Sequence, residues 1–282
     1  MVNGGDGDYT GYAWAQVGCA DTGSVHRVDE VKFASDMNVT CNLDSAFGSM
    51  GDLSNLVTFQ INDNSGVVGN VPADLGSLGL LSTLDLRENG LDGTVPASLG
   101  SASNLTFVDL GDNALRGTLP GALGGLAQLS ALYVDNNLLT GPVPETFNGL
   151  AALATFHGMN NLLSGPLPAL DALPALDEVR LQKNRLSGPL PATFLAGSSA
   201  TLTELRLLEN ALTGTLPATL TSFTAMTFFK VERRGGSGGP LATSARCPPP
   251  PSSLSPAAAR PSGAPHPLRR PPPFPSAKRT LP

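Results

Sequence analysis

The side chains best able to bind a metal ion or act as a nucleophile are few and widely separated in this chain of 282 residues. The histidines are His26, His157 and His266, and the cysteines are Cys19, Cys41 and Cys247. No two of the histidines lie within one short motif with Cys, Asp or Glu at metal-ligand spacing. The Gly-rich stretch 235–239 lacks the flanking strand, helix and Lys-Ser/Thr of a phosphate cradle. We therefore expect no metal, no cofactor and no catalysis.

Charge divides the chain into two unlike parts. Residues 1–229 contain 8 of the 17 Lys and Arg residues and 22 of the 23 Asp and Glu residues, whereas residues 230–282 contain 9 and 1. Fourteen of the 25 prolines also lie between Pro240 and Pro282. A Pro-rich, basic segment buries too little apolar surface to fold, so we expect residues 235–282 to be a disordered tail. The acidic part would repel nucleic-acid phosphates, and the sequence contains no apolar run long enough to span a membrane.

An asparagine recurs with spacings of 25, 24, 24, 24, 23 and 26 residues, and each copy carries apolar residues 8, 5 and 3 positions before it. The seven copies are Asn64, Asn89, Asn113, Asn137, Asn161, Asn184 and Asn210. Only Gly158 breaks the apolar columns. Two apolar residues two positions apart are typical of a short strand with one buried face, and N-x-L-x-G-x-[VL]-P follows in six copies.

This repeat predicts a solenoid of the α/β class, because one coil cannot bury its leucines alone and must share them with its neighbours. We expect the Asn to hydrogen-bond backbone groups from coil to coil, the Gly to permit a tight bend, and the Pro to end strand pairing. Residues 25–234 should then form a right-handed curved coil with about seven full repeats and degenerate end coils. A parallel β-sheet should line its concave side, and irregular or 3-10 structure its convex side. One extra residue between Asn64 and Pro72 predicts a local bulge.

The repeat L-x-x-L-x-x-L-x-L-x-x-N-x-L-x-G-x-[VL]-P-x-x-L-G resembles the plant-specific leucine-rich repeats of receptor-like kinase and receptor-like protein ectodomains and of polygalacturonase inhibitors. The stretch Trp14-Ala-Gln-Val-Gly-Cys19 looks like the end of that family's N-terminal cap, so residues 1–24 are interpreted as a cap remnant. The cap's usual earlier Cys is missing, which leaves the pairing of Cys19 and Cys41 open. The resemblance implies a solenoid outside the cell or at its surface, although the first residues lack the features of a secretory signal.

Residues 6, 4 and 2 positions before each Asn alternate with the buried ones, so they should point outward on the concave sheet. The middle coils there gather aromatic and charged side chains, a composition that favours recognition of a protein or peptide. The candidate partner-binding residues are Phe107, Asp109, Tyr133, Asp135, His157, Met159, Arg180 and Arg206. We expect Phe107 and Tyr133 to be exposed, and the order of charges predicts that a peptide lies with its basic end toward the N-terminal coils.

The leading hypothesis is therefore a non-catalytic interaction module that recognises a peptide, a protein or a carbohydrate on the concave sheet, as a fragment of a receptor-like or secreted protein. Inhibition of a secreted cell-wall hydrolase and an intracellular structural scaffold are the alternatives. For the tail, a wall-anchoring stalk, a linker and a wrongly predicted exon all fit the composition.

Overall fold

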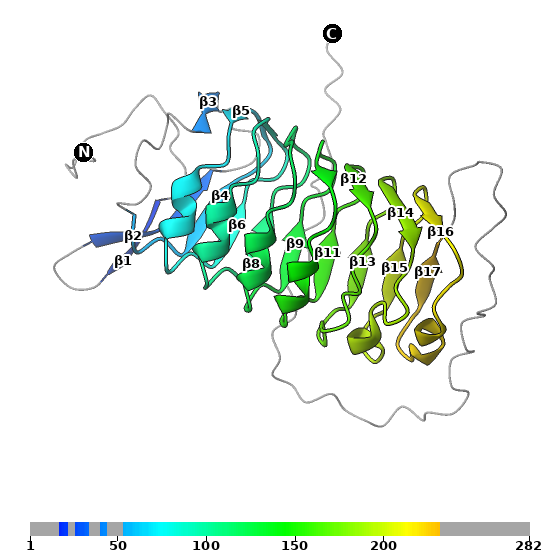
Figure 1. Cartoon of the computed structure of the whole chain (residues 1–282). Helices are drawn as coiled ribbons and strands as arrows, with labels where there is room; N and C mark the ends of the chain where they lie inside the picture. The colour runs from blue at the N-terminus through cyan, green and yellow to red at the C-terminus, as the bar shows by residue number, and fades with distance from the viewer. Residues whose placement is uncertain (1–16, 22–25, 34–39, 44–52, 232–282) are drawn as a thin grey trace, which may run out of the picture.

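The computed structural model describes residues 17–21, 26–33, 40–43 and 53–231. The predicted tail at 235–282 and most of the predicted cap at 1–24 lie outside the described residues. The described part is a stack of coils in which strands from successive repeats run side by side (Figure 1). Among the described residues, no helix is long and apolar enough to cross a bilayer.

Ten strands form the concave sheet, one from each coil plus one at the N-terminal edge. In sheet order they are β1 (Val17–Asp21), β2 (His26–Phe33), β4 (Thr58–Ile61), β6 (Thr83–Asp85), β8 (Phe107–Asp109), β9 (Ala131–Tyr133), β11 (Thr155–His157), β13 (Glu178–Arg180), β15 (Glu204–Arg206) and β17 (Phe228–Lys230). All neighbours are parallel except β1, which pairs antiparallel with β2. The predicted parallel concave sheet is confirmed.

Two smaller parallel sheets follow the strand ends. One contains β3 (Cys41–Asn42), β5 (Asn64–Gly69) and β7 (Asn89–Leu91), and the other contains β10 (Thr140–Gly141), β12 (Leu162–Gly165), β14 (Arg185–Pro189) and β16 (Ala211–Thr213). The register of β5 against β7 shifts between Asn64 and Val68. The bulge predicted from the extra residue in this repeat is therefore confirmed.

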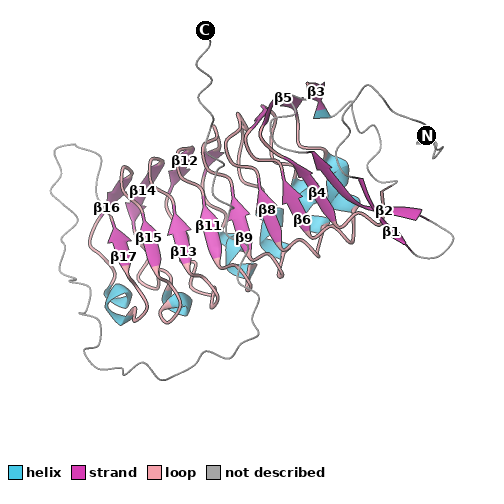
Figure 2. Ribbon diagram, turned by 180° about the vertical axis from the view of Figure 1, so that it is seen from behind, coloured by secondary structure: helices cyan, strands magenta, loops and turns pink. Residues whose placement is uncertain are grey.

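Short 3-10 helices lie on the side of the coils away from the concave sheet (Figure 2). They are η2 (Ala73–Ser77), η3 (Ala97–Ser101), η4 (Gly121–Gly125), η5 (Glu145–Gly149), η6 (Ala196–Ser198) and η7 (Ala218–Ser222). All except η6 begin directly after the repeat proline, which has an extended backbone conformation. The proline thus stands as the residue before the first helical turn, where its missing N–H leaves no hydrogen bond unmade.

The predicted leucine columns form one continuous core. Leu84, Leu86 and Leu132, for example, have no exposed surface. Where Gly158 interrupts a column, a Cβ atom would lie 3.0 Å from Leu181 Cδ2 and 3.5 Å from Leu163 Cδ1. Neighbouring leucines therefore fill the missing volume, which explains why the repeat tolerates the glycine.

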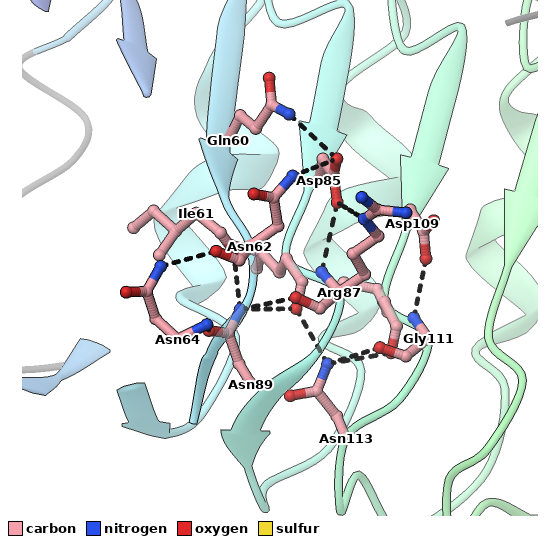
Figure 3. A network of polar contacts seen from close by, with 12 residues as sticks. Gln60, Ile61, Asn62, Asn64, Asp85, Arg87, Asn89, Asp109, Gly111 and Asn113 are labelled. Atoms are coloured by element: carbon pink, nitrogen blue, oxygen red, sulfur yellow. Dashed lines mark hydrogen bonds and ion pairs between the residues drawn. The ribbon is translucent and has the colours of Figure 1, made fainter. Parts of the chain in front are cut away.

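The repeat asparagines form a buried hydrogen-bonded ladder, as predicted. Asn113 Nδ2 donates to the carbonyl oxygen of Leu86 in the preceding coil at 2.9 Å, and to those of Leu110 and Gly111 in its own coil (Figure 3). Its Oδ1 accepts from the backbone N–H of Leu91 at 3.0 Å. From Asn89 to Asn210, each of these side chains donates to a backbone carbonyl of the preceding coil as well as to its own coil.

Candidate functional site

The candidate residues at the strand ends lie in one row across the concave sheet. Asp109 pairs with Tyr133, Tyr133 with His157, His157 with Arg180, and Arg180 with Arg206. Neighbouring strands lie about 4.8 Å apart, so these side chains stand next to one another. The structure therefore brings these five residues together on one face, with Phe107 at the start of β8 on the same face.

The expected exposure of the aromatic residues is wrong. Phe107 is 7 % exposed and Tyr133 only 4 %, and the two form with Ala131 a small apolar cluster separate from the core. Their ring centroids are 5.6 Å apart, and the Tyr133 ring meets the His157 ring edge-on at 4.9 Å. Large side chains in adjacent strands cover one another, so an outward direction does not mean an exposed surface. We call Phe107, Tyr133 and His157 the aromatic row.

On the N-terminal side of this row, carboxylates are buried in a polar network (Figure 3). Asp85 Oδ2 accepts hydrogen bonds from Gln60 at 3.2 Å and Asn62 at 3.0 Å. Arg87 extends from beside Asp85 toward Asp109, which accepts from the backbone of Gly111. Asp109 and Asp135 have no exposed surface. The carboxylates of these two candidate residues are therefore not accessible for direct contact with a ligand.

A second acidic row follows at the residues just before the repeat asparagines, where the backbone has positive φ. Glu88 hydrogen-bonds Asp63 through its side chain, and Asn136 Nδ2 donates to Asp112 Oδ1 at 2.6 Å and to Asp135 Oδ2 at 3.1 Å. The hydrogen bond to Asp63, partial burial and the charge of Asp63 raise the pKa of Glu88 to about 7. The hydrogen bond to Asp63 is the largest of these causes, so the two carboxyl groups are coupled at this point of the row.

On the C-terminal side, the two candidate arginines are held by glutamates. Arg180 donates to Glu204 through Nε at 2.6 Å and through Nη2 at 3.1 Å, and Arg206 Nε pairs with the same carboxylate. Glu178 contacts Arg180 at 3.4 Å and His157 Nε2 at 3.2 Å. The guanidinium groups are therefore already neutralised in part. Met159 lies beside this network, where its sulfur accepts from Gln182 Nε2 at 3.0 Å.

The candidate set omitted residues that the structure places on the same face. Glu178 and Glu204 hold the arginines, and the guanidinium carbon of Arg206 lies 4.2 Å from the centre of the Phe228 ring. Lys230 Nζ lies 5.5 Å from the same ring. The sequence could have indicated Phe228 and Lys230, because these two residues alternate along the strand with the partly buried Phe229 and Val231.

Within the described residues, no group of three or more His, Cys, Asp or Glu side chains could hold a metal ion. The face instead presents an acidic part, an aromatic centre and a part with alternating charges. Such a surface can recognise a polypeptide by shape and charge.

Residues 79–139 match the family model described as leucine rich repeat. No curated protein sequence matches the chain. Among solved structures, the Arabidopsis thaliana receptor kinase ectodomain GASSHO1/SCHENGEN3, in complex with CASPARIAN STRIP INTEGRITY FACTOR 2, is 29 % identical with a TM-score of 0.59. The match covers 76 % of this chain and 28 % of that one.

The Arabidopsis receptor kinase HAESA, in complex with the peptide hormone IDA and the co-receptor SERK1, is 25 % identical with a TM-score of 0.63. That match covers 80 % of this chain and 41 % of HAESA. A plant ice-binding protein shares the fold at 23 % identity and a TM-score of 0.58, with 79 % and 78 % of the two chains covered. The chain therefore spans less than half the length of these two receptors. The repeat, the stacked parallel sheet and these similarities show that the chain forms a leucine-rich-repeat solenoid similar to those of plant receptor kinase ectodomains.

Proposed function

We propose that the chain is a non-catalytic interaction module that binds a peptide or a protein segment across the concave sheet. The observation that carries this proposal is the aromatic row, in which Phe107, Tyr133 and His157 pack outside the core and between two charged regions. Core packing alone needs no aromatic residue on this face. A row fixed by its neighbours loses little side-chain freedom when a ligand binds, which favours affinity.

The similar receptors support a polypeptide partner and a location outside the cell or at its surface. HAESA was solved with a peptide hormone and a co-receptor, and the GASSHO1/SCHENGEN3 structure is of an ectodomain with its bound factor. The candidate binding face of this chain lies on a solenoid with the same fold as those ectodomains. We expect direct contacts from Met159, Arg180 and Arg206, which are half-buried, and from the exposed edges of the aromatic row.

The charge order favours one direction for a bound peptide. The acidic residues lie beside β6 to β9, so a basic end should lie over the N-terminal coils. An acidic end would lie near Arg180 and Arg206, but these share Glu204, so their attraction for it should be modest.

Selection of peptides from a displayed library on the full chain tests the proposal. We expect the selected peptides to protect the backbone amides of β8, β9 and β11 from hydrogen exchange. Binders that instead protect η3 to η5 on the opposite side would overturn the proposed surface.

A further inference from the structure

The N-terminal half of the concave side carries a contiguous excess of acidic groups. Asp63, Glu88 and Asp112 stand just before repeat asparagines and interact with one another, and Asn136 bridges Asp112 to the buried Asp135. The six residues, which we call the acidic stripe, are Asp63, Asp85, Glu88, Asp109, Asp112 and Asp135. Among the described residues on this part of the face, Arg87 is the basic group placed within the stripe. Six carboxyl groups beside one guanidinium group leave this part of the face with a net negative charge.

The opposite charge is present in the same chain. Residues 232–282, which lie outside the described residues, contain eight Lys and Arg residues and one acidic residue, Glu232. Four of the basic residues, Arg269, Arg270, Lys278 and Arg279, fall within eleven positions among prolines.

The two parts are within reach of each other. In sheet order, five strand spacings separate β17 from β8, which is about 24 Å at about 4.8 Å per strand. The 39 residues from Lys230 to Arg269 span up to about 130 Å when extended. Covalent linkage also sets an effective concentration in the millimolar range for such a segment.

We propose that the basic segment 232–282 binds the acidic stripe of its own chain and competes there with a partner for the concave sheet. The inference rests on the proposed function, because it describes regulation of the same surface. Guanidinium and ammonium groups pair with the carboxylates of Asp63, Glu88 and Asp112, while the buried aspartates strengthen the attraction through their field.

The test uses a fluorescein-labelled synthetic peptide with the sequence of residues 265–282. Its affinity is measured by fluorescence anisotropy for the full chain and for the full chain with Arg269→Gln, Arg270→Gln, Lys278→Gln and Arg279→Gln. The variant should bind the peptide about tenfold more tightly, because its own segment no longer competes, if the unlinked affinity is about 100 µM and the effective concentration about 1 mM. Raising the salt to about 0.5 M should remove most of the binding.

Charge variants made in the background of these four glutamine substitutions, which we call the four-glutamine variant, locate the surface. Glu88→Gln with Asp112→Asn should weaken peptide binding severalfold. Asp74→Asn with Glu145→Gln removes the same number of carboxylates from the first turns of η2 and η5 on the opposite side, and should have no effect.

Equal peptide affinity for the full chain and its four-glutamine variant overturns the inference, as does equal sensitivity to the two pairs of charge variants. If the molecular mass in solution rises with protein concentration for the full chain but not for the four-glutamine variant, the segment binds a second copy of the chain, which also overturns the inference. If the labelled peptide binds neither chain while library-selected peptides still protect β8, β9 and β11, this inference fails and the proposed function stands.

Discussion

The side-chain nitrogen of Asn137 donates a hydrogen bond to the carbonyl oxygen of Leu110, 27 residues earlier in the chain, at 2.9 Å. The same nitrogen donates to Val134 and Asp135, and its Oδ1 accepts from the backbone N–H of Leu115. One buried amide thus joins adjacent coils at the point where each leaves the concave sheet. Coil stacking therefore depends on polar contacts as well as on the leucine core.

Asn137→Ala should lower the free energy of unfolding by more than about 2 kcal/mol, because buried backbone groups lose their partners. Chemical denaturation measures the change. Asn104→Ala is the matched control, since Asn104 makes a single bond between coils, to Gly79, in an exposed position. It should cost less than about 1 kcal/mol. Similar losses in the two variants would contradict a structural role for the ladder.

Leu132→Ala should cost about 2 to 5 kcal/mol, because it opens a cavity in the centre of the core. Tyr133→Ala removes a ring from the small aromatic row on the other face, so it should cost less, about 1 to 2 kcal/mol. Denaturation of both variants checks the order. A larger loss for Tyr133→Ala would place the strand register one residue away from that described.

Gly100→Ala tests how closely the coils approach. A Cβ on Gly100 would lie 2.3 Å from the backbone oxygen of Ala122 in the next coil, so the coils must separate. We expect a loss of about 1 to 3 kcal/mol. Gly79→Ala is the control, because its Cβ would meet nothing within 4 Å. Unchanged melting temperatures for both variants would contradict this packing.

Glu88 should make stability depend on pH. Its pKa rises from 4.5 to about 7 on folding, so the folded state binds the proton more tightly than the unfolded state. This contribution is present below about pH 4.5 and is lost as the pH rises through about 7. Glu88→Gln resembles the protonated form. Its melting temperature should therefore equal that of the wild type at pH 5 and exceed it at pH 8. A melting difference that stays constant across this range would contradict the assignment.

Much of the fold follows from the sequence because each repeat position has a single physical role. Leu132 must be buried and Asn137 must bond its neighbours, so both could be assigned from spacing alone. The extra residue after Asn64 likewise had to appear as a bulge. The edge strand β1 was less predictable, because its pairing is antiparallel and lies outside the repeat.

For the candidate surface, the sequence predicts which residues share the concave face but not how far each side chain is exposed. Period-two alternation indicates which side chains leave the core, but not how far their neighbours cover them. Tyr133 is buried because Phe107 and His157 stand on either side, a contact between residues 24 or more positions apart. Similarly, Arg180 and Arg206 look like free cations in sequence, yet both pair with Glu204.

The central claim is that the concave sheet binds a polypeptide, and calorimetric titration of a library-selected peptide tests it most directly. Tyr133→Ala with Met159→Ala should weaken binding by more than about 2 kcal/mol, roughly thirtyfold, as central contact residues do. Val68→Ala with Leu80→Ala removes two exposed apolar side chains outside the concave sheet and should leave the affinity unchanged. Circular dichroism confirms that all variants are folded. If the affinity is unchanged by Tyr133→Ala with Met159→Ala but falls with Val68→Ala and Leu80→Ala, the account is contradicted.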